Sequence, residues 1–255
     1  MKNRCIINHT VLWVFAVLLL LTAACSREKN ENENEGPVIP ETGITMTTHA
    51  PNVFLRIVAE NDTITINWGD GTESKRFMPL SDQFEFTHSY SETRAHKITI
   101  TGNISNLSCL NNQLTSLDVS HNKVLTSLNC GVNQLTKLDM SSNTELQALS
   151  CYENQLTSLD VSGAAELEWL DCSGNQLAEL DMSSNTELKV LFCSQNQLTA
   201  SALNNLFGTL RSFDSYARNR NMNYQRWIVI HDNPGTNDCE IDIAEEKGWV
   251  VRFSY

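Results

Sequence analysis

The sequence is short of basic residues, and this shortage restricts the partners it can have. It contains 18 lysine and arginine residues against 30 aspartate and glutamate residues, which gives a formal net charge of −12. A chain this acidic is repelled by the phosphate backbones of DNA and RNA. We therefore expect no nucleic-acid partner, and we expect the charge to help keep a secreted chain in solution.

The motifs that carry catalysis are also missing. There is no Gly-x-Ser-x-Gly elbow, no His-Glu-x-x-His, no paired Cys-x-x-Cys and no phosphate-binding loop, and the six histidines are scattered. We expect no enzymatic activity, no catalytic residue, no cofactor and no metal site.

No apolar run is long enough to span a membrane, although the N-terminus carries a shorter one. Lys2 and Arg4 precede an unbroken apolar run from Val11 to Leu21, whereas a transmembrane helix needs roughly 20 apolar residues. A basic start, a short apolar stretch and small residues are typical of a signal peptide, so residues 1–24 are predicted to be removed.

The apolar run ends in Leu21-Thr22-Ala23-Ala24-Cys25. This pattern resembles the lipobox of bacterial lipoproteins, except that Thr22 stands where the family has a large aliphatic residue. The resemblance implies lipidation of Cys25, with palmitate among the acyl chains, and anchorage in the outer membrane, at the cell surface or on the periplasmic face. The alternative is a plain secretory signal cleaved after Ala24. Residues 25–42 are polar and proline-punctuated, which predicts a disordered tether.

Residues 43–102 show the two-residue period of half-buried β-strands, as in Ile64-Thr65-Ile66 and Ile98-Thr99-Ile100. Trp68-Gly69-Asp70-Gly71-Thr72, His88-Ser89-Tyr90 and the strand at 98–101 together resemble polycystic-kidney-disease (PKD) domains. The resemblance implies a small immunoglobulin-like sandwich that serves as an extracellular spacer or adhesion module. The match covers roughly sixty residues and lacks the family's Gly-x-Tyr, which allows a truncated or merged sandwich.

Three residues of this β-domain invite a metal or hydrolytic interpretation: Asp70, His88 and His96. No nucleophile or third ligand stands at a useful spacing. In PKD domains the Asp belongs to a turn and the His-x-Tyr pair packs structurally, so a structural role is favoured.

Cysteine recurs every 21 residues from position 109 to position 193, and the surrounding unit recurs with it. Each unit holds two half-units, LxxLxCxxNQ and LTxLDxSxN, each expected to form a short strand followed by an Asn turn. A fixed period of this kind indicates a solenoid. Residues 103–199 resemble bacterial leucine-rich repeats of the 21-residue class. The overall fold class is therefore mainly β, a small β-sandwich-like domain followed by this solenoid and an α/β C-terminal cap at 200–255.

Three columns of equivalent residues follow from the repeat. The five cysteines occupy an inward position that also accepts Val and Met, which favours buried free thiols over disulfides between neighbouring coils. The Asn residues form ladders interrupted at Ala164. Asp118, Asp139, Asp160 and Asp181 form an outward column, for which hydrogen bonds to Ser and Thr neighbours are favoured over a calcium site.

Outward positions in the first half-unit become aromatic toward the cap. Trp169, Val190 and Phe192 are predicted to point outward, with Tyr152 at the end of its strand. These four residues are the candidate ligand-binding surface of a monomeric, non-enzymatic module that binds an extracellular protein or glycan. Coverage of these rings by the arginine-rich segment 211–226 is one alternative, and a purely architectural envelope or spacer role is another.

Overall fold

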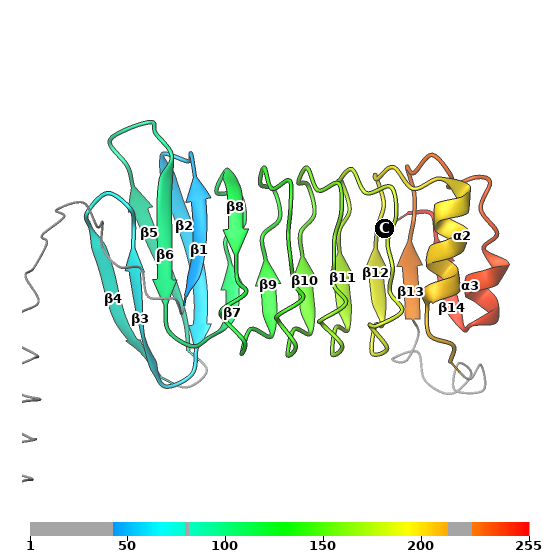
Figure 1. Cartoon of the computed structure of the whole chain (residues 1–255), viewed down its shortest axis with the longest axis horizontal. Helices are drawn as coiled ribbons and strands as arrows, with labels where there is room; N and C mark the ends of the chain where they lie inside the picture. Colours follow the sequence, from blue (N-terminus) through cyan, green and yellow to red (C-terminus); the bar gives the residue numbers. More distant parts are fainter. Residues whose placement is uncertain (1–42, 80–81, 214–225, 255) are drawn as a thin grey trace, which may run out of the picture. The chain divides into compact units, whose positions relative to one another are not determined.

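The computed structural model describes residues 43–79, 82–213 and 226–254 (Figure 1). The predicted signal peptide, Cys25, the predicted tether and residues 214–225 of the arginine-rich segment lie outside the described residues.

The N-terminal strands are β1 (Ile44–Thr48), β2 (Asn52–Ala59), β3 (Asp62–Asn67), β4 (Glu73–Met78), β5 (Gln83–Ser89) and β6 (His96–Thr101). They belong to two sheets, and their inward residues alternate with polar ones as the two-residue period predicts. Ile64, Ile66 and Trp68 are buried, for example, while Thr65 and Asn67 are half-exposed.

Both sheets continue from these strands into the repeats. The first coil supplies β7 (Ile104–Ser108) and β8 (Leu114–Asp118); β2 pairs with β7 and β1 with β8, both antiparallel. The sheets run in the orders β4-β3-β6-β1-β8 and β14-β13-β12-β11-β10-β9-β7-β2-β5. The N-terminal strands therefore cover the apolar interior of the first coil.

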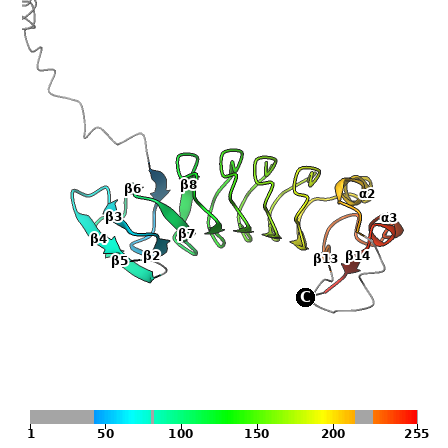
Figure 2. The same ribbon diagram turned by 90° about the horizontal axis from the view of Figure 1, so that it is seen from below.

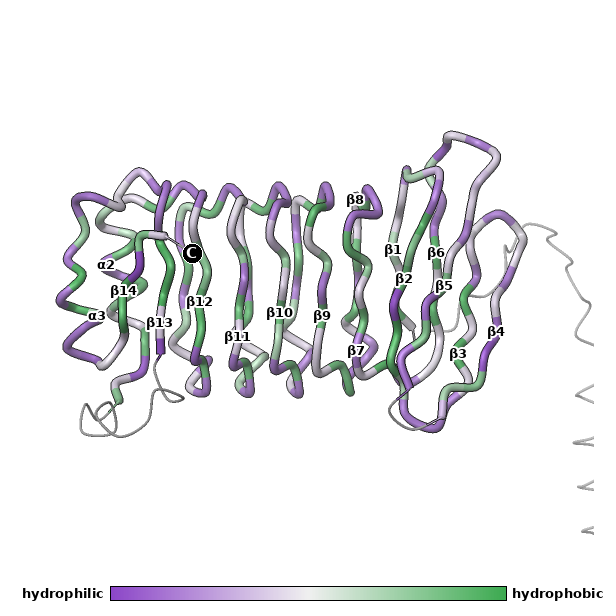
Figure 3. The backbone as a smooth tube through the Cα atoms, turned by 180° about the vertical axis from the view of Figure 1, so that it is seen from behind, coloured by the Kyte–Doolittle hydropathy of each residue, from purple (hydrophilic) through white to green (hydrophobic). Residues whose placement is uncertain are grey.

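The repeats form stacked coils with one short strand each: β9 (Ser127–Asn129), β10 (Ala148–Ser150), β11 (Trp169–Asp171) and β12 (Val190–Phe192). These strands are parallel and in register, so Leu128, Leu149, Leu170 and Leu191 align in one buried column. Figure 2 shows the four strands on the same side of their coils, and Figure 3 shows hydrophobic and hydrophilic segments alternating along the coils.

The prediction of a strand in every second half-unit is wrong. Among the described residues, only β8 is a strand in that part of the repeat, and the later coils form one isolated bridge between Asp139 and Asp160. The physical reason is that β8 pairs with β1, a strand from outside the repeats, and the later half-units have no such partner among the described residues. The Asp turn does not distinguish them, since Asp118 of β8 accepts from the Ser120 N–H at 2.9 Å just as Asp139 accepts from the Ser141 N–H at 2.8 Å.

The inward cysteines are buried free thiols, as predicted. Cys109, Cys130, Cys151, Cys172 and Cys193 are each 0% exposed and unpaired by disulfides. Burial raises the pKa of the Cys109 thiol to about 12, and it raises the pKa of the other four as well. These thiols therefore stay protonated and serve as small apolar side chains.

The Asn residues form the predicted ladder in the turns of the first half-unit. The Asn154 Nδ2 donates to the carbonyls of Cys130 (3.0 Å) and Cys151 (3.1 Å), and its Oδ1 accepts from the Leu135 N–H (2.9 Å). Each amide thus joins its own coil to the preceding one. Asn133, Asn175, Asn196 and Asn233 repeat the pattern.

The solenoid ends in an α/β cap: α2 (Ala200–Thr209), β13 (Arg226–Val229), α3 (Asp242–Glu246) and β14 (Trp249–Arg252). The Thr199 hydroxyl caps α2 by accepting from the Ala202 N–H at 3.2 Å. β13 and β14 continue the parallel sheet beyond β12. Buried Leu203, Leu206 and Phe207 place the apolar face of α2 against the last coil.

Candidate ligand-binding surface

The outward side chains of β11 to β14 form two rows across the sheet. Register places Trp169, Val190, Trp227 and Val250 in the first row. The second row, two residues further along each strand, holds Asp171, Phe192, Val229 and Arg252. Val229 is buried, Arg252 is exposed and the other six are partly exposed.

The rings in these rows contact one another diagonally. Phe192 lies between two tryptophans, with ring centroids 5.9 Å from Trp169 and 4.7 Å from Trp227, both edge to face. The Arg252 guanidinium lies over the Trp227 ring at 4.5 Å from its centroid. We call Trp169, Val190, Phe192, Trp227 and Arg252 the aromatic strip. Its contacts fix the rings in place, so little side-chain entropy would be lost on binding a ligand.

Three of the four residues predicted from the sequence lie in this strip, and Tyr152 does not. A Cβ atom at Gly131 would stand 2.5 Å from Tyr152 Cε1, so the tyrosine ring lies against the backbone of the preceding coil. The strip begins one coil later, at β11. The sequence analysis did not include Trp227 and Arg252 in the candidate surface, and the structure adds them to it instead of Tyr152.

Asp171 stands beside the rings at the N-terminal end of the second row. It accepts a hydrogen bond from the Ser173 N–H at 3.0 Å, and burial nevertheless raises the pKa of its carboxyl. A carboxyl whose pKa is higher in the folded than in the unfolded protein destabilises the fold when it is ionised. This penalty is present at neutral pH and disappears below about pH 4, where both states are protonated.

We therefore expect Asp171→Asn to raise the free energy of unfolding at pH 7, because Asn keeps the acceptor for Ser173 and removes the charge. The gain should vanish as the pH falls toward about 4. Urea unfolding at both pH values measures this. The matched control is Asp160→Asn, which should lower stability at pH 7, since hydrogen bonds from Ser162 lower the pKa of Asp160. A loss of stability at pH 7 in both variants would contradict the expectation.

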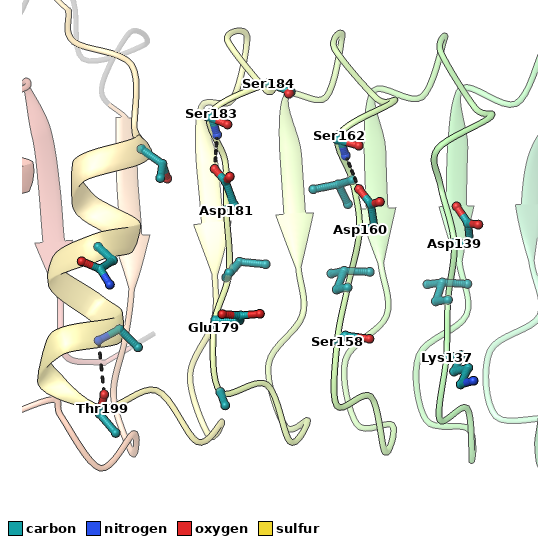
Figure 4. A pocket seen from close by; sticks show the side chains of 18 of the residues that line it. Lys137, Asp139, Ser158, Asp160, Ser162, Glu179, Asp181, Ser183, Ser184 and Thr199 are labelled. Atoms are coloured by element: carbon teal, nitrogen blue, oxygen red, sulfur yellow. Dashed lines mark hydrogen bonds between the residues drawn. The ribbon is translucent and has the colours of Figure 1, made fainter.

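A second surface is a groove of about 910 Å³ that follows the second half-units of three coils to α2 (Figure 4). Its sides carry Asp139, Asp160 and Asp181, each accepting from the N–H of the serine two residues later at 2.8 to 2.9 Å. These are hydrogen bonds to serine neighbours of the kind favoured for the Asp column from the sequence. Within the described ranges, no group of three His, Cys, Asp or Glu residues is placed to hold a metal ion.

Asp70, His88 and His96 belong to a packing network in the N-terminal strands. Asp70 bonds His88 Nε2 at 2.7 Å, and hydrogen bonds from Thr72 and His88 lower the pKa of Asp70. The His88 ring stacks on Trp68 with centroids 4.7 Å apart, and the Tyr90 hydroxyl donates to the Trp68 carbonyl at 2.6 Å. His96 is stacked on Tyr90. Every member is thus engaged in holding the turn and the strands after it.

Comparison with solved structures finds similarity to proteins of Listeria monocytogenes. The chain resembles the functional domain of InlJ from Listeria monocytogenes, described as including a cysteine ladder, at 24% identity over 56% of this chain and 47% of that one, with a TM-score of 0.34. It also resembles an internalin, InlF, from Listeria monocytogenes at 22% identity over 54% and 50% of the two chains, with a TM-score of 0.30. The chain spans about half the length of these structures. No protein-family model and no curated protein matches it.

The coils themselves define the class of protein: a mainly β chain whose 21-residue repeats stack into a solenoid with a parallel sheet. None of the helices in the described ranges combines the length and the apolar character needed to cross a membrane.

Proposed function

We propose that this chain is a non-enzymatic binding module of the cell envelope that recognises an extracellular protein or glycan through the aromatic strip. The observation that carries the proposal is the set of partly exposed, mutually packed rings at the end of an otherwise small and polar sheet face. Ser127, Asn129, Ala148 and Ser150 occupy the equivalent outward positions in the earlier coils. Tryptophan and arginine dominate the energetics of protein interfaces, and aromatic rings also stack on sugars.

The proposal is tested by glycan-array screening and by capture of purified surface proteins with the fragment 43–255. Saturable binding of a glycan or protein that is lost on substitution of strip residues would support it. Saturable binding that survives those substitutions would place recognition elsewhere.

The second candidate is an architectural spacer with no dedicated ligand. The continuity of both sheets from the N-terminal strands into the coils favours it, because such a junction resists bending. A chain that binds no glycan or surface protein, yet whose deletion changes envelope integrity, would support this role over recognition.

We also propose that Cys25 carries the lipid that anchors the module, from the lipobox-like residues before it and the tether-like residues after it. Acyl chains contribute ~0.8 kcal/mol per buried methylene, so Cys25→Ala should move the protein from the membrane to the soluble fraction. Membrane fractionation of parent and variant measures this. Equal membrane association of the two would refute lipidation at Cys25.

A further inference from the structure

The groove beside α2 has an apolar floor and a helical wall. Leu138, Leu159 and Leu180, one from each coil, line the floor, and Ala202, Asn205 and Thr209 of α2 line the wall. Thr209 holds the wall to the last coil, because its Oγ1 accepts from the Met182 N–H at 3.1 Å. On their other side, these coils are joined by the paired strands β9 to β12. On the groove side, the described residues form only the single bridge between Asp139 and Asp160, so most of the floor backbone has no strand partner.

The sides of the groove are strongly acidic. Asp139, Asp160, Asp181 and Glu179 line it, and Lys137 is the one cationic side chain in its lining. No ion pair between described residues involves any of these four carboxylates. Hydrogen bonds from Ser162 hold the pKa of Asp160 below its usual range, so this carboxylate stays ionised at neutral pH. Like charges in neighbouring coils repel one another, and a cationic partner would relieve that repulsion.

The spacing of these charges is that of side chains on one face of a helix. Neighbouring coils stand about 4.8 Å apart at their hydrogen-bonded strands. Residues three or four apart on a helix lie about 5–6 Å apart. A helix with lysines or arginines at that spacing can therefore place one cation near each of Asp139, Asp160 and Asp181. Its leucine-type face would then meet the floor at the partly exposed Leu159, between the buried Leu138 and Leu180, and its axis would run across the coils with one end toward the side of α2 (Figure 4).

We propose that this groove is a docking site for a basic amphipathic helix of a partner protein. The groove shares no residue with the aromatic strip, so this interaction is separate from the proposed recognition of a glycan or protein there. The complementarity is twofold: apolar side chains against the groove floor, where Leu159 is partly exposed, and cationic side chains against Asp139, Asp160 and Asp181.

The test uses the purified full-length chain and three fluorescent synthetic peptides of about 14 residues, long enough to form a helix on binding. The first contains leucine and lysine in an amphipathic pattern, the second has the same composition scrambled, and the third has glutamate in place of lysine. Fluorescence anisotropy should show saturable binding of the first peptide, with weakening as salt is raised. Equal affinity for the scrambled peptide would show attraction to net charge alone and would overturn the proposal, as would equal affinity for the acidic peptide.

Matched variants locate the binding. Asp160→Asn with Asp181→Asn keeps the acceptors for the serine N–H groups and removes two groove charges, and should weaken binding by about tenfold. The control is Glu145→Gln with Glu166→Gln, which removes two exposed charges outside the groove and the Asp column and should weaken binding by less than about twofold. Asn205→Arg, on the exposed face of α2, should weaken binding as strongly as the groove pair. Equal weakening by the groove pair and the control pair, or no effect of Asn205→Arg, would show that the peptide binds elsewhere.

Discussion

Replacing Trp169 and Phe192 together by alanine is expected to abolish capture of whichever glycan or surface protein the parent chain binds. A single hot-spot tryptophan can account for about 2 kcal/mol or more of binding free energy, which is roughly a thirtyfold change in affinity. Removing Phe192 also removes the ring that holds Trp169 and Trp227 in position, so the two losses should not be independent. Binding is measured by titration of the ligand identified in the screen.

Stability measurements separate a binding role from a packing role. Edge-to-face pairs contribute about 0.5–1.5 kcal/mol each, so the double variant should unfold only a few degrees below the parent. Phe77→Ala is the control, since Phe77 is 60% exposed on β4 and should affect neither ligand capture nor melting temperature. A drop of tens of degrees in the double variant would instead mark the rings as buried packing. Coverage of the rings by the segment 211–226 would produce that result.

Asn154→Ala is expected to lower the free energy of unfolding by about 3 kcal/mol, the upper part of the range for a buried group left without a partner. The substitution leaves the Leu135 N–H without its acceptor and removes the donor to Cys130 and Cys151. Asn154 is only 8% exposed, so water replaces these hydrogen bonds poorly. Thermal and urea unfolding measure the loss.

Two further substitutions serve as controls for Asn154→Ala. Asn205→Ala, on the exposed face of α2, should change stability by less than about 0.5 kcal/mol. Ala164→Ser should cost less than Asn154→Ala, because the turn at 164 already lacks the amide. Similar small losses for all three variants would mean that the Asn ladder contributes little to the stability of the coils.

The sequence predicts which residues of each repeat face inward, because the same apolar pattern recurs every 21 residues. A 21-residue period with two inward residues per half-unit determines which side of each strand faces the core. Trp169 and Phe192 therefore had to point outward on either side of buried Leu170 and Leu191. The inward cysteines followed from the same alignment with Val and Met.

The rest depends on pairing that no local pattern specifies. Trp227 was recognisable as part of a strand, but the repeat breaks after Leu198, and nothing in the sequence sets the register of β13 against β12. The absence of strands in the second half-units reflects missing partners, because β8 is a strand only where β1 lies beside it. The turn of Tyr152 toward Gly131 depends on the glycine in the preceding coil, a contact between residues 21 positions apart.

The placement of β1 has a mechanical consequence. This strand, which begins one residue into the described part of the chain, is bonded by antiparallel ladders to β6 on one side and to β8 of the first coil on the other. If the chain is held at its N-terminus and pulled by a ligand at the opposite end, the tension crosses β1 at right angles, because the strands lie across the direction in which the coils stack (Figure 1). Its five residue pairs with β6 and four with β8 would then open one after another from the N-terminal end of the strand. The lifetime under tension would be set by the rate at which β1 peels from its sheet.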